Sequence, residues 1–234
     1  EFRRVLFRSM LTVIIVGLAM GTTVTIGKSV GAGKLDAASA SIGNTVTFFM
    51  GMSVVVMAVL VFLVNPIVTL IGIPAEAVAG TRQYLFVCFL GIPFITAYNV
   101  ISAIFRGLGD SQSPMYFIAI ACVANIVLDY VFIGGLGMGP IGAALGTTLA
   151  QTISVIVALI AIRKKDTGIS LKRSDLKPEG KTLKNILGIG IPISLQDGFI
   201  QISFIVITII VNQRGLNDAA AVGIVEKIIS FVFL

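Results

Sequence analysis

Six long apolar segments, and a seventh at the end of the chain, dominate this sequence of 234 residues. The segments are 10–26, 45–64, 84–104, 115–133, 141–162, 186–211 and 219–234, separated by Gly, Pro, Asn, Asp or Lys. A helix needs about 20 residues to cross a bilayer, and most of these segments approach that length. They do not show the alternation over about 10 residues that is typical of membrane barrel strands. Since helices then remain the only way to satisfy the backbone in lipid, the sequence predicts an all-α, polytopic transmembrane bundle.

The composition supports a membrane protein and argues against several kinds of chemistry. Hydrophobic residues make up 56% of the chain and charged residues only 12%, whereas soluble domains carry about 25% charged residues. The two cysteines, Cys88 and Cys122, lie inside apolar segments, and the sequence contains no His. No disulfide framework, metal-ligand spacing or His-based catalytic set can be built from these residues. We therefore expect neither an enzyme nor a resident cofactor.

The basic residues predict how the chain is oriented in the membrane. Eight of them lie in one polar stretch between the fifth and sixth segments: Arg163, Lys164, Lys165, Lys172, Arg173, Lys177, Lys181 and Lys184. This clustering is typical of a cytoplasmic loop and argues against a nucleic-acid partner. If each segment crosses once, Lys28, Lys34 and Arg106 also fall inside, and the outer loops hold only Arg82 and Arg214.

The two ends of the chain do not fit a complete protein. Residues 1–9 carry three arginines, yet the same scheme places them outside, against the positive-inside rule. We interpret residues 1–9 as a non-native leader and infer that a helix of the natural protein, which would precede residue 10, is missing. The alternative is a short native basic tail. The chain also stops within an apolar segment that contains Glu226 and Lys227. Both features predict an internal fragment.

The glycine-rich stretches indicate helix packing rather than nucleotide binding. In 21–29 the spacing before Gly-Lys-Ser is one residue too long for a phosphate loop, and 31–35 lacks the Ser or Thr that would meet magnesium. Later in the chain small residues recur at three- and four-residue spacing, at Gly142, Ala143, Gly146 and Ala150. Small residues let membrane helices approach closely, so this stripe predicts a packing face.

Three oxygen-bearing side chains in the fourth and fifth segments form the first candidate site. Asn125 and Asp129 are four residues apart and therefore share a helix face. From the helix rise, Asp129 and Asn125 lie about 6 and 12 Å from the outer end of their segment, and Thr147 about 9 Å from the outer end of the next. Such oxygens suit a sodium ion or a proton. The alternative is a hydrogen-bonded cluster between helices without a role in transport.

A second polar group, Gln196, Asp197 and Gln201, lies near the middle of the sixth segment. Pro192 precedes it, and a helix broken there would resemble the binding sites of transporters. The alternative is an Asp paired with a residue on a missing helix.

The third segment offers two further candidates, Tyr98 and Asn99, which follow Pro93 and could line the same cavity. The alternative for Pro93 is a simple kink. The turn after this segment ends at Ser113 and Pro114, which we expect to start the next helix, and we assign it no ligands.

These residues resemble the multidrug and toxic compound extrusion (MATE) transporters. The resemblance is carried by Gly31-Ala32-Gly33-Lys34 with Ala37, by Arg106-Gly107-Leu108-Gly109-Asp110 to Pro114, by Asn125-Ile126-Val127-Leu128-Asp129, and by Gly139 to Gln151. It implies part of a twelve-helix, two-lobe fold, about helices two to seven and the start of eight. Residues 10–162 would then form the first lobe, 163–185 the cytoplasmic loop between the lobes, and 186–234 the truncated start of the second lobe.

The resemblance also implies a function. Family members export drugs or other small, often cationic, molecules in exchange for sodium or protons, and the family's Asn, Asp and Thr of the first-lobe cation site match Asn125, Asp129 and Thr147. The helix-one Asp of that site has no counterpart in this chain. The resemblance implies a monomer in the bacterial inner membrane, with a small-molecule substrate and the lipid bilayer as its partners. A related lipid-linked saccharide flippase and a non-transporting membrane scaffold remain as alternatives.

Overall fold

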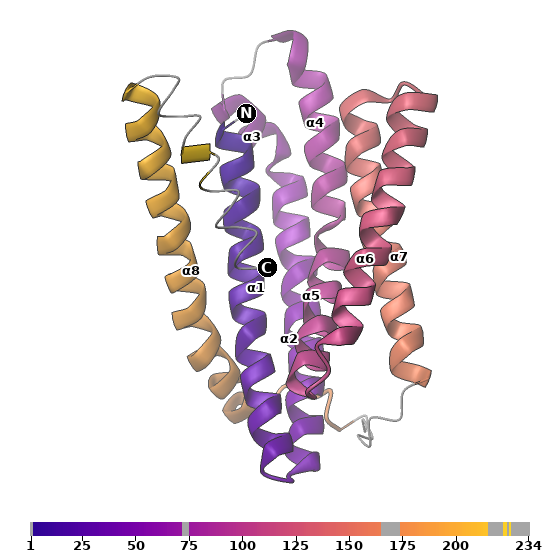
Figure 1. Ribbon diagram of the computed structural model, residues 1–234, viewed down its shortest axis with the longest axis vertical. Helices are drawn as coiled ribbons and strands as arrows, with labels where there is room; N and C mark the ends of the chain where they lie inside the picture. The colour runs from indigo at the N-terminus through magenta and orange to yellow at the C-terminus, as the bar shows by residue number, and fades with distance from the viewer. Residues whose placement is uncertain (1, 72–74, 165–173, 215–221, 224, 226–234) are drawn as a thin grey trace.

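The computed structural model describes residues 2–71, 75–164, 174–214, 222, 223 and 225, and it confirms the all-α prediction for this part of the chain. The helices, shown in Figure 1, are α1 (Phe2–Gly31), α2 (Leu35–Phe62), α3 (Val64–Ile71), α4 (Ala75–Leu90), α5 (Ile92–Gly107), α6 (Gln112–Asp129), the π-helix η1 (Tyr130–Gly135), α7 (Gly139–Lys164) and α8 (Gly180–Arg214).

Five stretches of the described residues are long and apolar enough to cross a membrane: Leu35–Phe62, Val78–Gly107, Gln112–Gly135, Gly139–Arg163 and Gly180–Phe204. They correspond to the second through sixth predicted segments. The first predicted segment lies in α1, which is 30 residues long and already helical from Phe2. The seventh falls almost entirely outside the described residues.

The third crossing is broken close to its proline. It is built from α4 and α5, which meet at Gly91, and Pro93 lies in the first turn of α5. Proline is tolerated there because the first amides of a helix have no carbonyl partner within it. Pro93 therefore marks a break between two helices, as the kink alternative expected. The short helix α3 was not predicted.

Helix ends divide the bundle into two sides, as the basic residues predicted. In Figure 1 the α1–α2 turn, the start of α6, the end of α7 and the start of α8 all lie toward the lower end. The helix α3, the start of α4 and the η1–α7 turn lie at the upper end. The lower end is therefore the side that the distribution of Lys and Arg predicts to be cytoplasmic.

Two apolar clusters hold the helices together around α5. One side of α5 packs against α1 and α2 through Val100 and Ile104, in a cluster that also contains Phe49 of α2 and Ile186 of α8. Another side packs between α6 and α7, where the rings of Phe105 and Phe117 meet edge to face at 5.4 Å. α5 therefore links the candidate site on α6 and α7 to the rest of the bundle.

The outer face of α6 explains why this fold needs lipid. Val123 and Ile126 are 63% and 66% exposed, and Met115 and Ile118 are more than half exposed. A continuous apolar surface of this kind is unfavourable in water and is typical of a face that contacts lipid chains.

The closest approach between α1 and α8 is made by small residues. A Cβ at Gly17 would lie 2.6 Å from the Cα of Ser194, and one at Gly190 would lie 2.8 Å from the carbonyl oxygen of Leu18. These contacts fall in the first half of α8, and the second half diverges from α1 toward the upper end (Figure 1). Small residues thus bring the two backbones together on the predicted cytoplasmic side.

The end of the basic loop is bound to α2. The side chain of Asn44 accepts a hydrogen bond from the backbone N–H of Glu179 at 2.5 Å and donates to the carbonyl of Ala40 at 2.9 Å. The hydroxyl of Thr47 donates to the carbonyl of Leu176 at 2.8 Å. These bonds anchor the residues just before α8 to the predicted first lobe.

Candidate functional site

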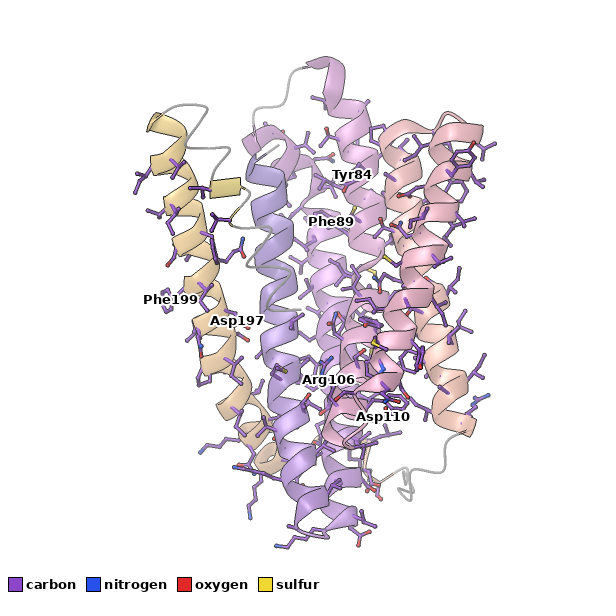
Figure 2. All side chains as sticks on the ribbon, viewed as in Figure 1. Tyr84, Phe89, Arg106, Asp110, Asp197 and Phe199 are labelled. Carbon is purple, nitrogen blue, oxygen red and sulfur yellow. The ribbon has the colours of Figure 1, made fainter. Side chains whose placement is uncertain are left out.

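The start of α6 is fixed by Asp110. Its carboxylate accepts hydrogen bonds from the backbone N–H groups of Gln112 (3.2 Å) and Ser113 (3.1 Å) and from the hydroxyl of Ser113 (2.5 Å). The helix therefore begins one residue before the expected Ser113, because a carboxylate satisfies the free amides of the first turn. Figure 2 shows Asp110 and Arg106 near the lower end of the bundle.

The other end of α6 turns into a π-helix immediately after Asp129. The six residues of η1 continue the crossing, and the N–H of Leu136 donates to the carbonyl of Val131 at 2.9 Å. A π-helical turn rotates the following residues relative to an α-helix, and such turns occur frequently at functional sites. Here the π-helical turn lies between Asp129, the last residue of α6, and the residues that lead into α7.

Asp129 lies directly against the backbone of α7. A Cβ at Gly146 would collide with Oδ1 of Asp129 and would lie 3.3 Å from its Cγ. One turn toward the outer end, a Cβ at Gly142 would lie 3.0 Å from the Cβ of Phe132. The predicted small-residue stripe is therefore a contact face, and Gly146 leaves the space that the carboxylate fills.

The three predicted oxygens lie on these two packed helices. Gly146, the neighbour of Thr147, is in contact with Asp129, and Asn125 is one turn below Asp129 on the same face. The hydroxyl of Thr147 donates to the carbonyl of Ala143 at 3.0 Å, which leaves its oxygen lone pairs free to accept.

Several polar atoms of this cluster are buried without a hydrogen-bond partner among the described residues. They are Oδ1 of Asp129, Nδ2 of Asn125 and Oε1 of Gln151. Leaving such atoms unsatisfied costs about 1–3 kcal/mol each, and more for a charged group. Buried groups of this kind therefore call for an explanation, of which a bound ion, proton or substrate is one.

The donor set fits a hard cation. Carboxylate, amide and hydroxyl oxygens are the ligands that hard metal ions prefer, and the unpartnered Oδ1 of Asp129 supplies a negative charge. Within the described residues there is no group of three or more His, Cys, Asp or Glu side chains that could hold a transition metal. The arrangement therefore suits sodium or a proton better than zinc, copper or iron.

Tyr98 and Asn99 occupy different surroundings. Tyr98 packs at the edge of the apolar cluster between α5, α6 and α7. The side chain of Asn99 donates to the carbonyl of Ile95 at 2.8 Å, a bond within its own helix. Neither residue is brought together with the polar group of α8, so the shared cavity that we expected is not formed by these contacts.

The polar group on α8 is separated from the first cluster. Asp197 and Gln201 are partly buried and Gln196 is exposed, and in Figure 2 Asp197 lies on the side of α8 toward α1. α8 and the α6–α7 pair lie on opposite sides of the bundle with α1 between them (Figure 1). The helix also continues through Pro192, so the expected broken helix is wrong.

The sequence analysis did not include Gln151 of α7 among the candidate site residues. The signal that could have identified it is its position one turn after Thr147.

Comparisons with known proteins agree with this architecture. A family model described as MatE matches residues 6–131, a range that includes Asn125 and Asp129 and ends before Thr147. The probable multidrug resistance protein YpnP of Bacillus subtilis (strain 168) is 32% identical over 221 residues, covering 94% of this chain and 49% of that protein. The probable multidrug resistance protein YoeA of the same strain is 28% identical over 224 residues, covering 93% and 48%.

A solved structure matches over a similar extent. A MOP superfamily transporter from Pyrococcus furiosus superposes with a TM-score of 0.84 at 26% identity, covering 96% of this chain and 51% of that one. It is described as having a binding pocket of reverse polarity that suggests a different function. The chain therefore spans about half the length of the relatives it matches.

Proposed function

The chain belongs to the MatE family of transporters, and from this premise we propose that it forms the first lobe, and the beginning of the second, of a secondary antiporter. The antiporter exports drugs or other small, often cationic, molecules in exchange for sodium or protons. Asn125, Asp129 and Thr147 bind the coupling ion. This assignment explains why a membrane helix carries a partly buried carboxylate at that position.

One observation carries the proposal. Oδ1 of Asp129 is buried within a membrane-spanning stretch and has no hydrogen-bond partner among the described residues. A buried carboxylate oxygen without a partner is unfavourable, and a bound ion would supply that partner. If the ion binds differently in two conformations, this contact supplies the free-energy difference that coupling requires.

The same difference can drive exchange. If the ion binds more tightly in one conformation than in the other, its binding shifts the population toward that conformation. A cationic substrate that competes for the negative charge, or that prefers the ion-free conformation, then leaves as the ion enters. In this scheme Asp129 holds the charge, and Asn125 and Thr147 orient the ion.

The test is drug efflux by the complete gene product in proteoliposomes with imposed sodium or proton gradients. Asp129→Asn removes the charge at nearly constant size and is expected to abolish gradient-driven efflux of ethidium. Asp36→Asn, at an exposed position in the first turn of α2, is the matched control and is expected to transport like the native protein. The gradient that drives native efflux identifies the ion.

Normal coupling in Asp129→Asn would refute the assignment. In that case the cluster on α6 and α7 is a packing feature, and Asp197→Asn is the next variant to measure. Loss of efflux in both Asp129→Asn and Asp36→Asn would indicate a general defect in folding, which size-exclusion profiles of the purified proteins detect.

The main alternative is a flippase for lipid-linked saccharides. We retain an alternative because a different function is suggested for the Pyrococcus furiosus relative. Such a protein needs cationic side chains along its path to bind a phosphate-linked headgroup. In the described membrane-spanning stretches, the basic residues lie near the helix ends, at Arg82, Arg106, Arg163, Lys181 and Lys184. This distribution favours the antiporter.

We also propose that the protein is monomeric and lies in the bacterial inner membrane with the basic loop in the cytoplasm. In a background with Cys88 and Cys122 replaced by Ala, Ser111→Cys should react with an impermeant maleimide only after the membrane is opened. Leu136→Cys, at the opposite end of the bundle, should react in intact cells. The reverse pattern would contradict the orientation.

A further inference from the structure

Gln151 is a partly buried polar residue of the predicted first lobe that the proposed site leaves without a role. Its Oε1 is buried and has no hydrogen-bond partner among the described residues, although the residue lies in a membrane-spanning helix. A glutamine in such a position normally bonds to a neighbouring helix. An unused carbonyl oxygen therefore needs a physical reason.

Two contacts define the register of α6 against α7 around Gln151. Toward the outer end, Asp129 meets Gly146. Toward the inner end, the hydroxyl of Ser154 donates to the carbonyl of Phe117 at 2.9 Å. Gln151 lies between these contacts on α7, as Asn125 does on α6.

The direction of the side chains brings Gln151 toward the site. Gln151 lies four residues after Thr147 and three before Ser154, so the three residues share one face of α7. Side chains on a helix lean toward its N-terminus. On α7 this is toward the outer end, and on α6 toward the inner end, so the side chains of Gln151 and Asn125 lean toward the same level.

From this geometry we infer that Gln151 is a further ligand of the coupling ion, and that it sets the affinity and selectivity of the site. The inference rests on the proposed function. Asp129 and Thr147 contact the ion from the outer side, and Asn125 and Gln151 contact it from about one turn further in. The two levels are about 6 Å apart along the helix axis, which leaves room for one ion between them.

The unpartnered atoms support this assignment over direct pairing of the two amides. Nδ2 of Asn125 is a free donor and Oε1 of Gln151 is a free acceptor, and both are buried, yet no hydrogen bond joins them. If the pair existed only to hold the helices together, that bond would be made. Oε1 of Gln151 instead remains available to a cation, which Asn125 would contact through its Oδ1 rather than through the donor Nδ2.

The experiment measures how the complete gene product responds to its coupling ion. Ethidium efflux is recorded against sodium concentration and, separately, against pH, and the ion that drives the native protein is then used for each variant. Binding of radioactive sodium to the purified protein, or proton release on ethidium binding if protons drive efflux, gives a second readout. The variants are Gln151→Leu, which removes the side-chain oxygen, and Gln151→Glu, which keeps a side-chain oxygen at that position. Ser154→Ala is the packing control.

We expect Gln151→Leu to raise the half-saturating ion concentration about tenfold while the maximal rate stays within about twofold. Loss of one ligand worth about 1.4 kcal/mol gives a change of this size. Gln151→Glu should restore ion binding, and Ser154→Ala should leave the half-saturating concentration unchanged. For a sodium-driven protein, Gln151→Leu should also change the ratio of sodium to lithium affinity, which a packing defect would not do.

The inference is overturned if Gln151→Leu binds the ion within twofold of native, or if Ser154→Ala shifts binding equally. Asp129→Asn separates this failure from failure of the proposed function. If Asp129→Asn abolishes coupling and Gln151→Leu has no effect, only the role of Gln151 is wrong. If Asp129→Asn also has no effect, the whole cation site is wrong.

Discussion

Gly146→Ala should damage ion binding without unfolding the protein. The added methyl would collide with Oδ1 of Asp129, and it would lie 3.3 Å from Cγ, close to the ordinary contact limit of 3.4 Å. Rotating the carboxylate by about 1 Å at Oδ1 relieves the collision with little movement of the backbone. The structural cost is then that of an off-rotamer side chain, about 0.5–1.5 kcal/mol.

The effect on sodium binding follows from the longer distance between the carboxylate of Asp129 and the ion. A ligand oxygen of a hard cation lies about 2.4 Å from the ion. Moving the charge from about 2.4 to about 3.4 Å at an effective dielectric constant of about 20 weakens the attraction by about 2 kcal/mol. This corresponds to roughly thirtyfold weaker binding, since 1.4 kcal/mol is a factor of ten.

The assay compares sodium-dependent efflux and radioactive sodium binding in Gly146→Ala and Gly142→Ala. The second variant places its methyl 3.0 Å from the Cβ of Phe132, so it crowds α7 against η1, next to the site, without touching the carboxylate. We expect only Gly146→Ala to lose ion affinity, with similar thermal unfolding of both proteins. Equal loss of affinity in the two variants would refute the reasoning, because the effect would then be general crowding between α6 and α7.

Two further predictions concern the contacts on the predicted cytoplasmic side. Asn44→Ala leaves the N–H of Glu179 without its acceptor, so we expect the protein to lose about 1–3 kcal/mol of stability and to be cleaved faster by trypsin after the exposed Lys181. The buried Ser41→Ala is the control, and cleavage of Asn44→Ala at the native rate would contradict the prediction. Gly190→Ala places a methyl 2.8 Å from the backbone oxygen of Leu18 and should cost about 1–3 kcal/mol in thermal unfolding. Gly188→Ala meets nothing within 4 Å and should be neutral, and equal destabilisation by both would show that α1 and α8 do not pack as described.

The membrane crossings could be predicted from the sequence because the bilayer imposes one length and one kind of hydrogen bonding on each of them. The same constraint makes a carboxylate inside a crossing conspicuous, so Asp129 and its neighbour Asn125 were found without tertiary information. Their common face follows from the helix period alone.

Other features depend on how particular side chains meet. The break at Gly91 and the π-helix after Asp129 interrupt segments that read as uniform apolar helices. Hydropathy cannot distinguish these backbones, because it records only how apolar the residues are and not which carbonyl accepts from each amide. The prolines suggested two interruptions: the one at Pro93 lies beside the break between α4 and α5, and the one at Pro192 is absent from the continuous α8.

The sequence by itself determined that the chain is a membrane bundle, which segments cross, and that an ionisable group lies within one crossing. Only the tertiary structure decided that Gly146 provides the space for Asp129, that Oε1 of Gln151 is buried without a partner among the described residues, and that Asp197 stands apart on α8. The physical reason is the distance along the chain over which each effect acts. Solvation by lipid acts on each residue wherever it packs, whereas a site is defined by side chains from different helices whose register is set by contacts far apart in the chain.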